Sequence, residues 1–205
     1  MVGTIIVLDN PAPESGLVAL FGETLDYLPY SIGEVTTNAA NGSADSLDVL
    51  VSLVGVVHCI DFDGNEGLSF TIIDENNDGV NVFNFDDVSD YVVNEGDKIN
   101  VLGKIGQFNG LTQVFADSIS ILETGLPTVT PTIVTTLDET TEAQWITIEN
   151  VSFVNPIATF PTGSNNIDVT DGTNVFALRI DSDTDINGSL APTGTFDLIA
   201  IGGQF

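Results

Sequence analysis

Basic residues are nearly missing from this chain. Three of them, Lys98, Lys104 and Arg179, stand against 30 aspartates and glutamates, and the formal net charge is −27 at pH 7. Proteins that bind nucleic acid need a basic surface that displaces the counterions of the phosphates, and anionic lipid surfaces also attract basic segments. The sequence therefore predicts no nucleic-acid partner and disfavours binding to anionic lipid surfaces. The carboxylates favour solubility or a salty habitat, and they also favour divalent cations.

Cysteine, histidine and long apolar runs are equally scarce. Cys59 is the only cysteine, so no intrachain disulfide can form, and we expect it in a strand core. His58 is the only histidine, and its place in the alternation predicts a surface position. No apolar run approaches the roughly 18 residues of a membrane span, which predicts no membrane insertion. Residues 1–4 lack the start of a signal peptide, so the chain is either cytosolic or has lost its signal.

Catalytic patterns are also missing. The chain has no Gly-x-Ser-x-Gly elbow and no phosphate-binding glycine loop. Carboxylate pairs suited to glycoside hydrolysis are abundant, but most lie in turns without an apolar pocket to raise a pKa. The sequence therefore predicts that the protein is not an enzyme.

What is present is β-sheet patterning, clearest at residues 96–122. Apolar and polar residues alternate through residues 99–104 and again through 114–121, the period of a strand with one buried face. Asn109-Gly110 supplies the positive φ of a tight hairpin, and Gly103 predicts a bend or bulge in mid-strand. A bent strand followed by a hairpin predicts the closing half of a small barrel.

The same patterning gives an all-β fold and its domain boundaries. Further strands are predicted at residues 47–60, 68–74 and 80–85, so that residues 47–122 form one five-stranded barrel. Residues 1–46 are assigned to an N-terminal β segment and linker. Residues 123–136, rich in threonine and proline, are assigned to a second linker, and residues 137–205 to a second domain.

The second domain repeats the first. Gly79 to Phe83 (GVNVF) matches Gly172 to Phe176 (GTNVF), and Ile105 to Phe108 (IGQF) matches Ile201 to Phe205 (IGGQF). A repeat of this length indicates two copies of one domain. The second copy stops before its fifth strand, which predicts an open sheet edge that pairs with another strand.

Two sources for that strand remain open. One is an apolar segment near the N-terminus of this chain or of a neighbouring chain: Thr4, Ile5, Ile6, Val7 and Leu8. The other is a longer parent protein from which this sequence is a piece.

Residues 49–205 resemble the tandem OB-fold-like modules of large secreted proteins of Bacteroidetes-type bacteria, related to domains beside extracellular endonucleases. The resemblance is carried by short motifs that include Gly55-Val56-Val57, Phe70 to Asp74, Ile105 to Leu111, Val169 to Thr173 and Gly202 to Phe205. It implies two five-stranded Greek-key barrels, the second without its last strand, in a secreted or cell-surface accessory module. OB folds often bind oligonucleotides or oligosaccharides, and the charge here argues against the former.

Acidic loops are the remaining chemical signal, and they predict calcium. In residues 74–79, oxygen-bearing side chains alternate before a glycine, as in the first half of an EF-hand loop, and residues 181–188 repeat the pattern. The expected ligands are the following side chains: Asp74, Asn76, Asp78, Asp181, Asp183, Asp185 and Asn187. Residues 61–66 are a weaker candidate. Each loop alternatively serves only as an acidic turn.

Three hypotheses for function follow. The first is a non-catalytic structural or assembly module of a secreted or surface protein or an extracellular filament, with other protein chains or further copies of itself as partners. The second is a carbohydrate-binding module that stacks a glycan on Trp145, Tyr27, Tyr30 or Tyr91. The third is an accessory domain of an enzyme in a longer chain.

Overall fold

Strands make up nearly all of the regular structure, which confirms the all-β prediction. The computed structural model describes residues 26–64 and 67–203. The first sheet is formed by β1 (Leu28–Pro29), β2 (Leu50–His58), β3 (Leu68–Ile73), β4 (Gly79–Asn84), β5 (Lys98–Phe108) and β6 (Leu111–Glu123), and the helix α1 (Ile32–Val35) lies between β1 and β2 in the chain. The second sheet is formed by β7 (Thr132–Ile133), β8 (Trp145–Phe153), β9 (Asn165–Thr170), β10 (Val175–Ile180) and β11 (Phe196–Ile201), and the 3-10 turn η1 (Glu139–Thr141) lies between β7 and β8 in the chain. Within the described residues, no helix has the length and hydropathy to cross a membrane.

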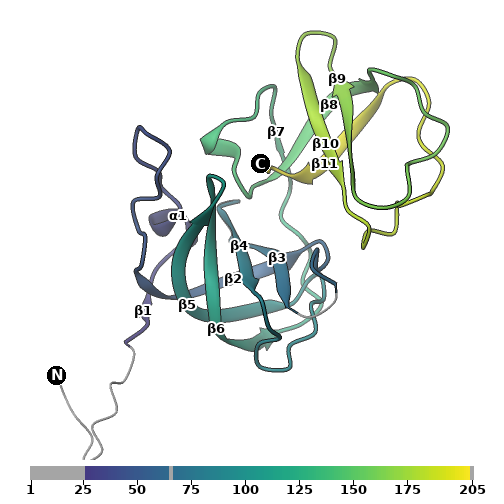
Figure 1. Cartoon of the computed structure of the whole chain (residues 1–205). Helices are drawn as coiled ribbons and strands as arrows, with labels where there is room; N and C mark the ends of the chain where they lie inside the picture. The colour runs from purple at the N-terminus through teal and green to yellow at the C-terminus, as the bar shows by residue number, and fades with distance from the viewer. Residues whose placement is uncertain (1–25, 65–66, 204–205) are drawn as a thin grey trace, which may run out of the picture.

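Strands β2 to β6 close into a barrel (Figure 1). The strands pair in the order β2-β3-β4-β6-β5, and β5 pairs again with β2 to complete the ring. Neighbours are antiparallel except β4 and β6, which run parallel. Closure leaves no free edge among these five strands, so their backbone groups pair within the barrel.

The β5–β6 hairpin forms where the sequence predicts it. Asn109 and Gly110 have φ of 51° and 96°, as the tight turn requires. The pairing shifts register between Leu102 and Gly103, which is the predicted bulge. A Cβ at Gly103 would lie 2.3 Å from the Phe115 carbonyl oxygen, so only glycine fits where the two strands approach.

The barrel interior is a closed apolar core. Along β2, alternate residues Val51, Leu53 and Val57 are fully buried, on the face that the alternation predicts. The short helix α1 covers one end of the barrel with Ile32 and Val35, both buried in the same cluster. The second half of the predicted N-terminal segment is therefore part of the first domain, because β1 pairs with β2 and α1 packs on the barrel core.

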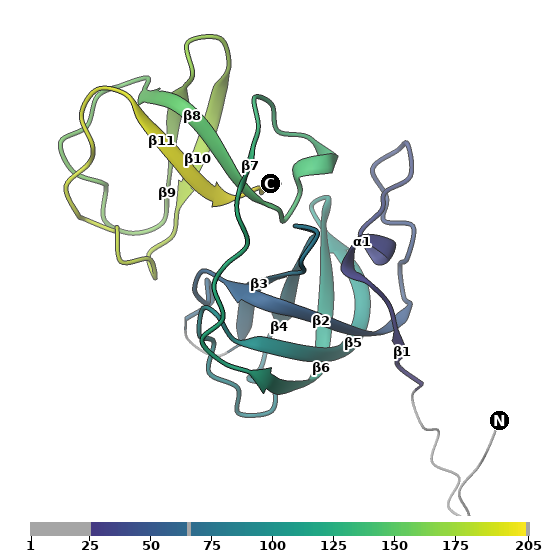
Figure 2. The same cartoon turned by 180° about the vertical axis from the view of Figure 1, so that it is seen from behind.

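The second sheet follows the same plan with one strand fewer (Figure 2). Its order is β10-β9-β8-β11, with β7 parallel to β8 just as β1 is parallel to β2. The pair β8–β11 corresponds to β2–β5, and β9–β10 corresponds to β3–β4. β7 lies inside the range expected to be a linker.

The registers correct the internal alignment. Ile72 pairs with Val80 in the first sheet, and Val169 pairs with Phe176 in the second. Val80 therefore corresponds to Phe176, whereas the match between the two sequence motifs equates Phe83 with Phe176. The turn between β9 and β10 is one residue shorter than that between β3 and β4, and the buried face decides the register.

Two other expectations are wrong at the end of β2. His58 is fully buried, although a surface position was predicted. Its Nδ1 lies 2.9 Å from the Val56 carbonyl oxygen, and its Nε2 accepts the Val129 N–H at 3.1 Å. Cys59 lies just beyond the strand, half-buried, with a left-handed φ of 64°. The segment that joins the two sheets covers this strand end, which no local pattern reveals.

Candidate functional site

The second sheet has an opening between β10 and β11. In the first barrel β6 occupies the corresponding place, between β4 and β5. Within the part of the chain that the structure describes, β10 pairs only with β9 and β11 pairs only with β8. Side chains from both strands still join one hydrophobic cluster, so the sheet curls with its two ends unpaired.

The core behind this opening is incompletely covered. Its fully buried members include Val151 and Ile180, but four apolar side chains of the cluster stay partly exposed: Leu178 on β10, Phe196 and Leu198 on β11, and Ile167 on β9. Burying a fully exposed side chain of this size contributes roughly 1.5–3 kcal/mol, and these four, already partly buried, would each contribute a fraction of that. A strand laid across the opening would complete their burial at the cost of its own ordering entropy.

Each of the two edge strands also exposes a large apolar side chain. Val175 on β10 is 64% exposed and Ile199 on β11 is 53% exposed. Natural sheet edges are commonly protected by lysine, proline or a covering segment. β10 carries one charge, Arg179, and β11 carries one, Asp197; neither strand contains lysine or proline, so protection against strand pairing is weak.

The segment expected to supply a strand lies outside the described residues: Thr4, Ile5, Ile6, Val7 and Leu8. Of the predicted strand-addition site, the structure therefore describes only the acceptor edges, β10 and β11.

The first predicted calcium loop, residues 74–79, caps its own hairpin. One oxygen of Asp74, Oδ1, accepts the N–H groups of Asn76 and Asp78 at 2.8 and 3.1 Å. Burial, and then the Asp74 carboxylate, raise the pKa of Asp78. The Asn76 side chain is exposed.

The residue of this loop with the most contacts is one that the sequence analysis missed. Asn77 is buried, and its side-chain amide bonds both backbone groups of Trp145: it accepts the N–H and donates to the C=O, each at 2.9 Å. It also donates to the Thr132 hydroxyl at 3.0 Å. Loop 74–79 thus fastens the first barrel to β7 and β8. The positive φ of Asn77, 67°, is the only local sign of its special position.

The backbones of the two sheets also approach closely next to this loop. A Cβ on Gly79 would lie 1.9 Å from the Ala143 carbonyl oxygen, and one on Gly202 would lie 1.9 Å from the Thr141 carbonyl oxygen. The segment 141–143 therefore passes between a glycine of each sheet, at a spacing that excludes any side chain.

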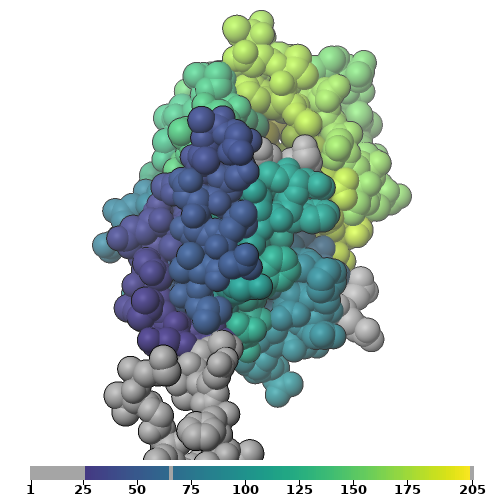
Figure 3. All heavy atoms as spheres, turned by 60° about the vertical axis from the view of Figure 1, so that its left-hand side comes forward, coloured from purple at the N-terminus to yellow at the C-terminus, as the bar shows by residue number. Residues whose placement is uncertain are grey.

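Residues 36–46 extend the same contact on the surface (Figure 3). The Gln107 amide donates to the Gly42 carbonyl at 2.8 Å, and its oxygen accepts the Ala44 N–H, which holds the segment against the β5–β6 hairpin. Asn38 then donates to Glu139 of η1 at 2.5 Å.

A cavity of about 350 Å³ lies between this segment, the start of β4 and η1. Asp78 and Glu142 both line it. Glu142 accepts the Thr112 N–H at 2.9 Å through Oε1, while its Oε2 is buried without a hydrogen bond. Burial raises the pKa of Glu142. Asp78 and Glu142 are thus two carboxylates whose pKa is raised by burial beside this cavity.

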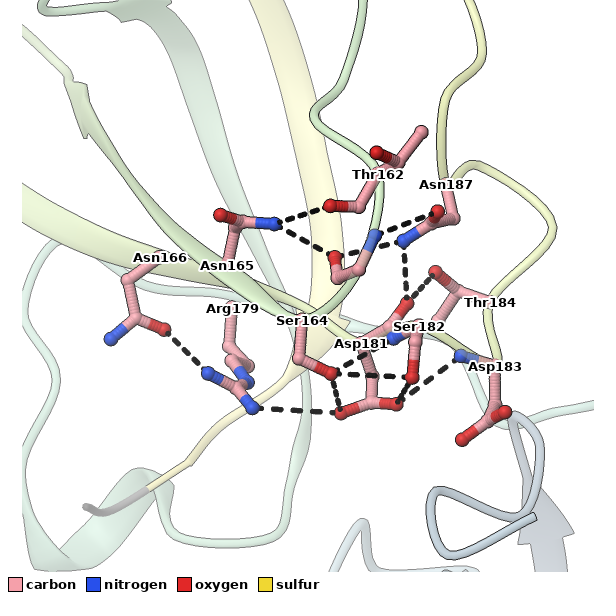
Figure 4. Close-up of polar contacts among 11 residues, drawn as sticks. Thr162, Ser164, Asn165, Asn166, Arg179, Asp181, Ser182, Asp183, Thr184 and Asn187 are labelled. Atoms are coloured by element: carbon pink, nitrogen blue, oxygen red, sulfur yellow. Dashed lines mark hydrogen bonds and ion pairs between the residues drawn. The ribbon is translucent and has the colours of Figure 1, made fainter.

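The second predicted calcium loop, residues 181–188, is held by its own polar contacts (Figure 4). Asp181 accepts the Asp183 N–H at 3.2 Å and the Ser164 hydroxyl at 3.0 Å, and lies 3.7 Å from the Arg179 guanidinium. Burial alone would raise the pKa of Asp181, but these bonds lower it on balance. Asn187 clamps Gly163 through both a donated and an accepted hydrogen bond.

The remaining ligands of this loop face outward. Asp183 and Asp185 are exposed. Partial desolvation, followed by the carboxylates of Asp181, Asp61 and Asp63, raises the pKa of Asp183. Acidic loops of both sheets therefore meet at Asp183. Among the described residues, no group of three or more metal-binding side chains has the arrangement of a metal centre, so calcium stays a prediction.

The aromatic side chains expected to stack a glycan lie in three different settings. Tyr91 is buried and donates to Asp97 at 3.2 Å, so its ring cannot be a platform. Trp145 packs edge-on against His58, with ring centroids 5.7 Å apart. Tyr27 donates to Asp117 at 2.9 Å, and Tyr30 packs against the core of the first barrel.

Comparison with known proteins adds no assignment, because no protein-family model and no curated protein matches this chain. The candidate site is therefore judged by its geometry.

Proposed function

We propose that this protein is a non-catalytic assembly module whose second sheet is completed by a strand added between β10 and β11. One observation carries the proposal. The first barrel is closed by β6, whereas the second sheet has the same pairing order with both flanking edges unpaired among the described residues. A sheet with an incomplete core and two unprotected edges gains apolar burial and hydrogen bonds when a strand is added.

The proposal includes two tandem OB-like barrels in a secreted or cell-surface protein or an extracellular filament. The Greek-key order of β2 to β6 supports the OB-like assignment, and the parallel β1–β2 and β7–β8 pairs support the tandem arrangement. The extracellular location rests on the resemblance described above. Other protein chains or further copies of this one are the proposed partners.

Calcium belongs to the same proposal as a stabilising ion. The loops at residues 74–79 and 181–188 carry the proposed ligands, and a cation would offset the repulsion among Asp61, Asp63 and Asp183 where the two sheets meet.

Light scattering after size exclusion, over a wide range of protein concentration, tests the assembly proposal. We expect the mass to rise with concentration above the 21.6 kDa of one chain. Ile199→Asp places a charge on the edge strand β11 and should weaken association. The matched control is Val54→Asp, at an exposed apolar position on β2, a strand that is paired within the barrel.

Two results would contradict the proposal. One is a wild-type protein that stays monomeric at every concentration. The other is equal weakening by Ile199→Asp and Val54→Asp, which would point to net charge and not to the β11 edge.

A further inference from the structure

We infer that the strand which fills the opening is residues 4–8 of a second copy of this chain, running parallel to β10 and antiparallel to β11. The inference rests on the proposed function and names its partner. Each copy then offers one strand and one acceptor edge, and such head-to-tail contacts build an open filament unless the rotation happens to close a ring.

The direction follows from the first barrel. There β6 runs parallel to β4 and antiparallel to β5. Val82 on β4 pairs with Val114 on β6, and the registers make Leu178 the counterpart of Val82. The added strand is therefore centred beside Ala177, Leu178 and Arg179 of β10.

Apolar side chains on both faces of the opening favour an apolar donor strand. A strand placed there would cover Leu178 and Leu198 on its inner face. On its outer face the large apolar neighbours are Val175 and Ile199, and Arg179 is the one cation. Strands that are apolar on both sides read as continuous hydrophobic runs without alternation. Residues 4–8, Thr-Ile-Ile-Val-Leu, have this pattern, whereas β6 alternates and exposes Asp117 and Ser120.

Charge points the same way. In a chain with a net charge of −27, residues 1–8 contain no carboxylate, and the first is Asp9. The acceptor edges carry Asp197 on β11 and Arg179 on β10, and Arg179 already pairs with Asp181 at 3.7 Å. An uncharged strand avoids the like-charge repulsion that most other segments of this protein would meet there.

A second copy fits better than the same molecule. Figures 1 and 2 both show β1 on the side of the first barrel remote from the second sheet. Residues 9–27 would have to carry segment 4–8 around the barrel to reach β10 and β11 of their own chain. A neighbouring copy needs no such path.

The test uses the full chain with single substitutions. Ile6→Asp places a charge in the donor strand and should weaken self-association about tenfold or more, since a buried unpaired charge is costly. Val18→Asp, another apolar position within residues 1–25, is the matched control and should associate like the wild type. Circular dichroism confirms that each variant keeps its β structure.

Mixing two defective variants gives the decisive result. Ile6→Asp keeps an intact edge, and Ile199→Asp keeps an intact donor strand. Each alone should stay monomeric, and the mixture should form dimers with one molecule of each. No longer species should appear, because both ends of such a dimer are blocked.

The contrary outcomes separate the donor from the proposed function. If the wild type assembles and Ile6→Asp assembles equally well, the donor is wrong while assembly stands. A mixture that stays monomeric also rejects the donor. If the wild type is monomeric with hydrogen-exchange protection along β10 and β11, residues of the same molecule fill the opening and the inference fails. A monomer with both edges unprotected overturns the inference and the proposed function together.

Discussion

Asn77 shows how one side chain can fasten two sheets. It bonds the N–H and the C=O of Trp145 as a neighbouring strand would, and it does so from a buried position. Its left-handed φ is tolerated by asparagine better than by most residues. The adjacent Asn76 is exposed, and its side chain has no comparable contact.

We therefore expect Asn77→Gly to lower the free energy of unfolding by roughly 1–3 kcal/mol, because buried partners in Trp145 lose their hydrogen bonds. Glycine keeps the positive φ, so the change isolates the side chain. Urea denaturation followed by Trp145 fluorescence measures it. Asn76→Gly is the matched control and should lie within about 0.5 kcal/mol of the wild type. Equal effects at both positions would contradict this role.

His58 is held as one neutral tautomer. The Val56 carbonyl can only accept and the Val129 N–H can only donate, so Nδ1 carries the hydrogen and Nε2 keeps its lone pair. Burial lowers the pKa of His58, while the Val56 bond and the Glu95 carboxylate oppose that shift. Protonation would break the contact with the segment that joins the two sheets.

The sign of the pH dependence follows. Since the folded pKa lies below the ordinary value of about 6.5, the unfolded chain binds the proton first, and stability falls as pH drops below about 6.5. As the only histidine, His58 gives one set of imidazole NMR signals. We expect a titration midpoint below 6.5 and nitrogen shifts of the Nδ1–H tautomer. A midpoint above 6.5 or the Nε2–H tautomer would rule this out.

At the scale of elements, the sequence predicts strands well and their registers less well. The β5–β6 hairpin was readable because Asn109-Gly110 and Gly103 each demand one backbone geometry. The register of β10 was not readable, because aligning Phe83 with Phe176 ignores the difference in length between the two turns. The correct register follows only when the buried face of each strand is known.

The candidate site divides in the same way. A missing fifth strand was predictable from the repeat, because strand order follows from comparing two copies. The contacts of His58, Asn77 and Glu142 were not predictable, because each depends on a residue distant in sequence. Local spacing carries no information about such contacts, and the acidic spacing in loop 74–79 drew attention to metal instead of to docking.

The acidic loops carry a prediction of their own. If calcium binds at residues 74–79 or 181–188, a concentration ten times its dissociation constant should raise the Tm by about 3 °C or more over a chelator. Magnesium at equal ionic strength is the control, because screening alone relieves repulsion in so acidic a chain. Equal Tm values in calcium and in magnesium would remove calcium from the account. Asp181→Asn should abolish a calcium-specific increase that comes from loop 181–188, and Asp74→Asn one that comes from loop 74–79.

The whole molecule combines one finished sheet with one unfinished sheet. The first barrel has a sealed core around Phe70 and Leu53, whereas the second leaves Leu178 and Leu198 partly exposed. The contacts around Asn77 and segment 141–143 join the two sheets, with the opening between β10 and β11 placed on the second one. This contrast between the two sheets is what the proposed assembly function rests on.

Hydrogen exchange of the amides of β10 and β11, measured by mass spectrometry across protein concentrations, tests the open edge most directly. The account predicts fast exchange of the outward-pointing amides of these two strands in dilute solution and increasing protection as concentration rises, while β8 and β9 keep constant protection. Protection at β10 and β11 that is independent of concentration would contradict it.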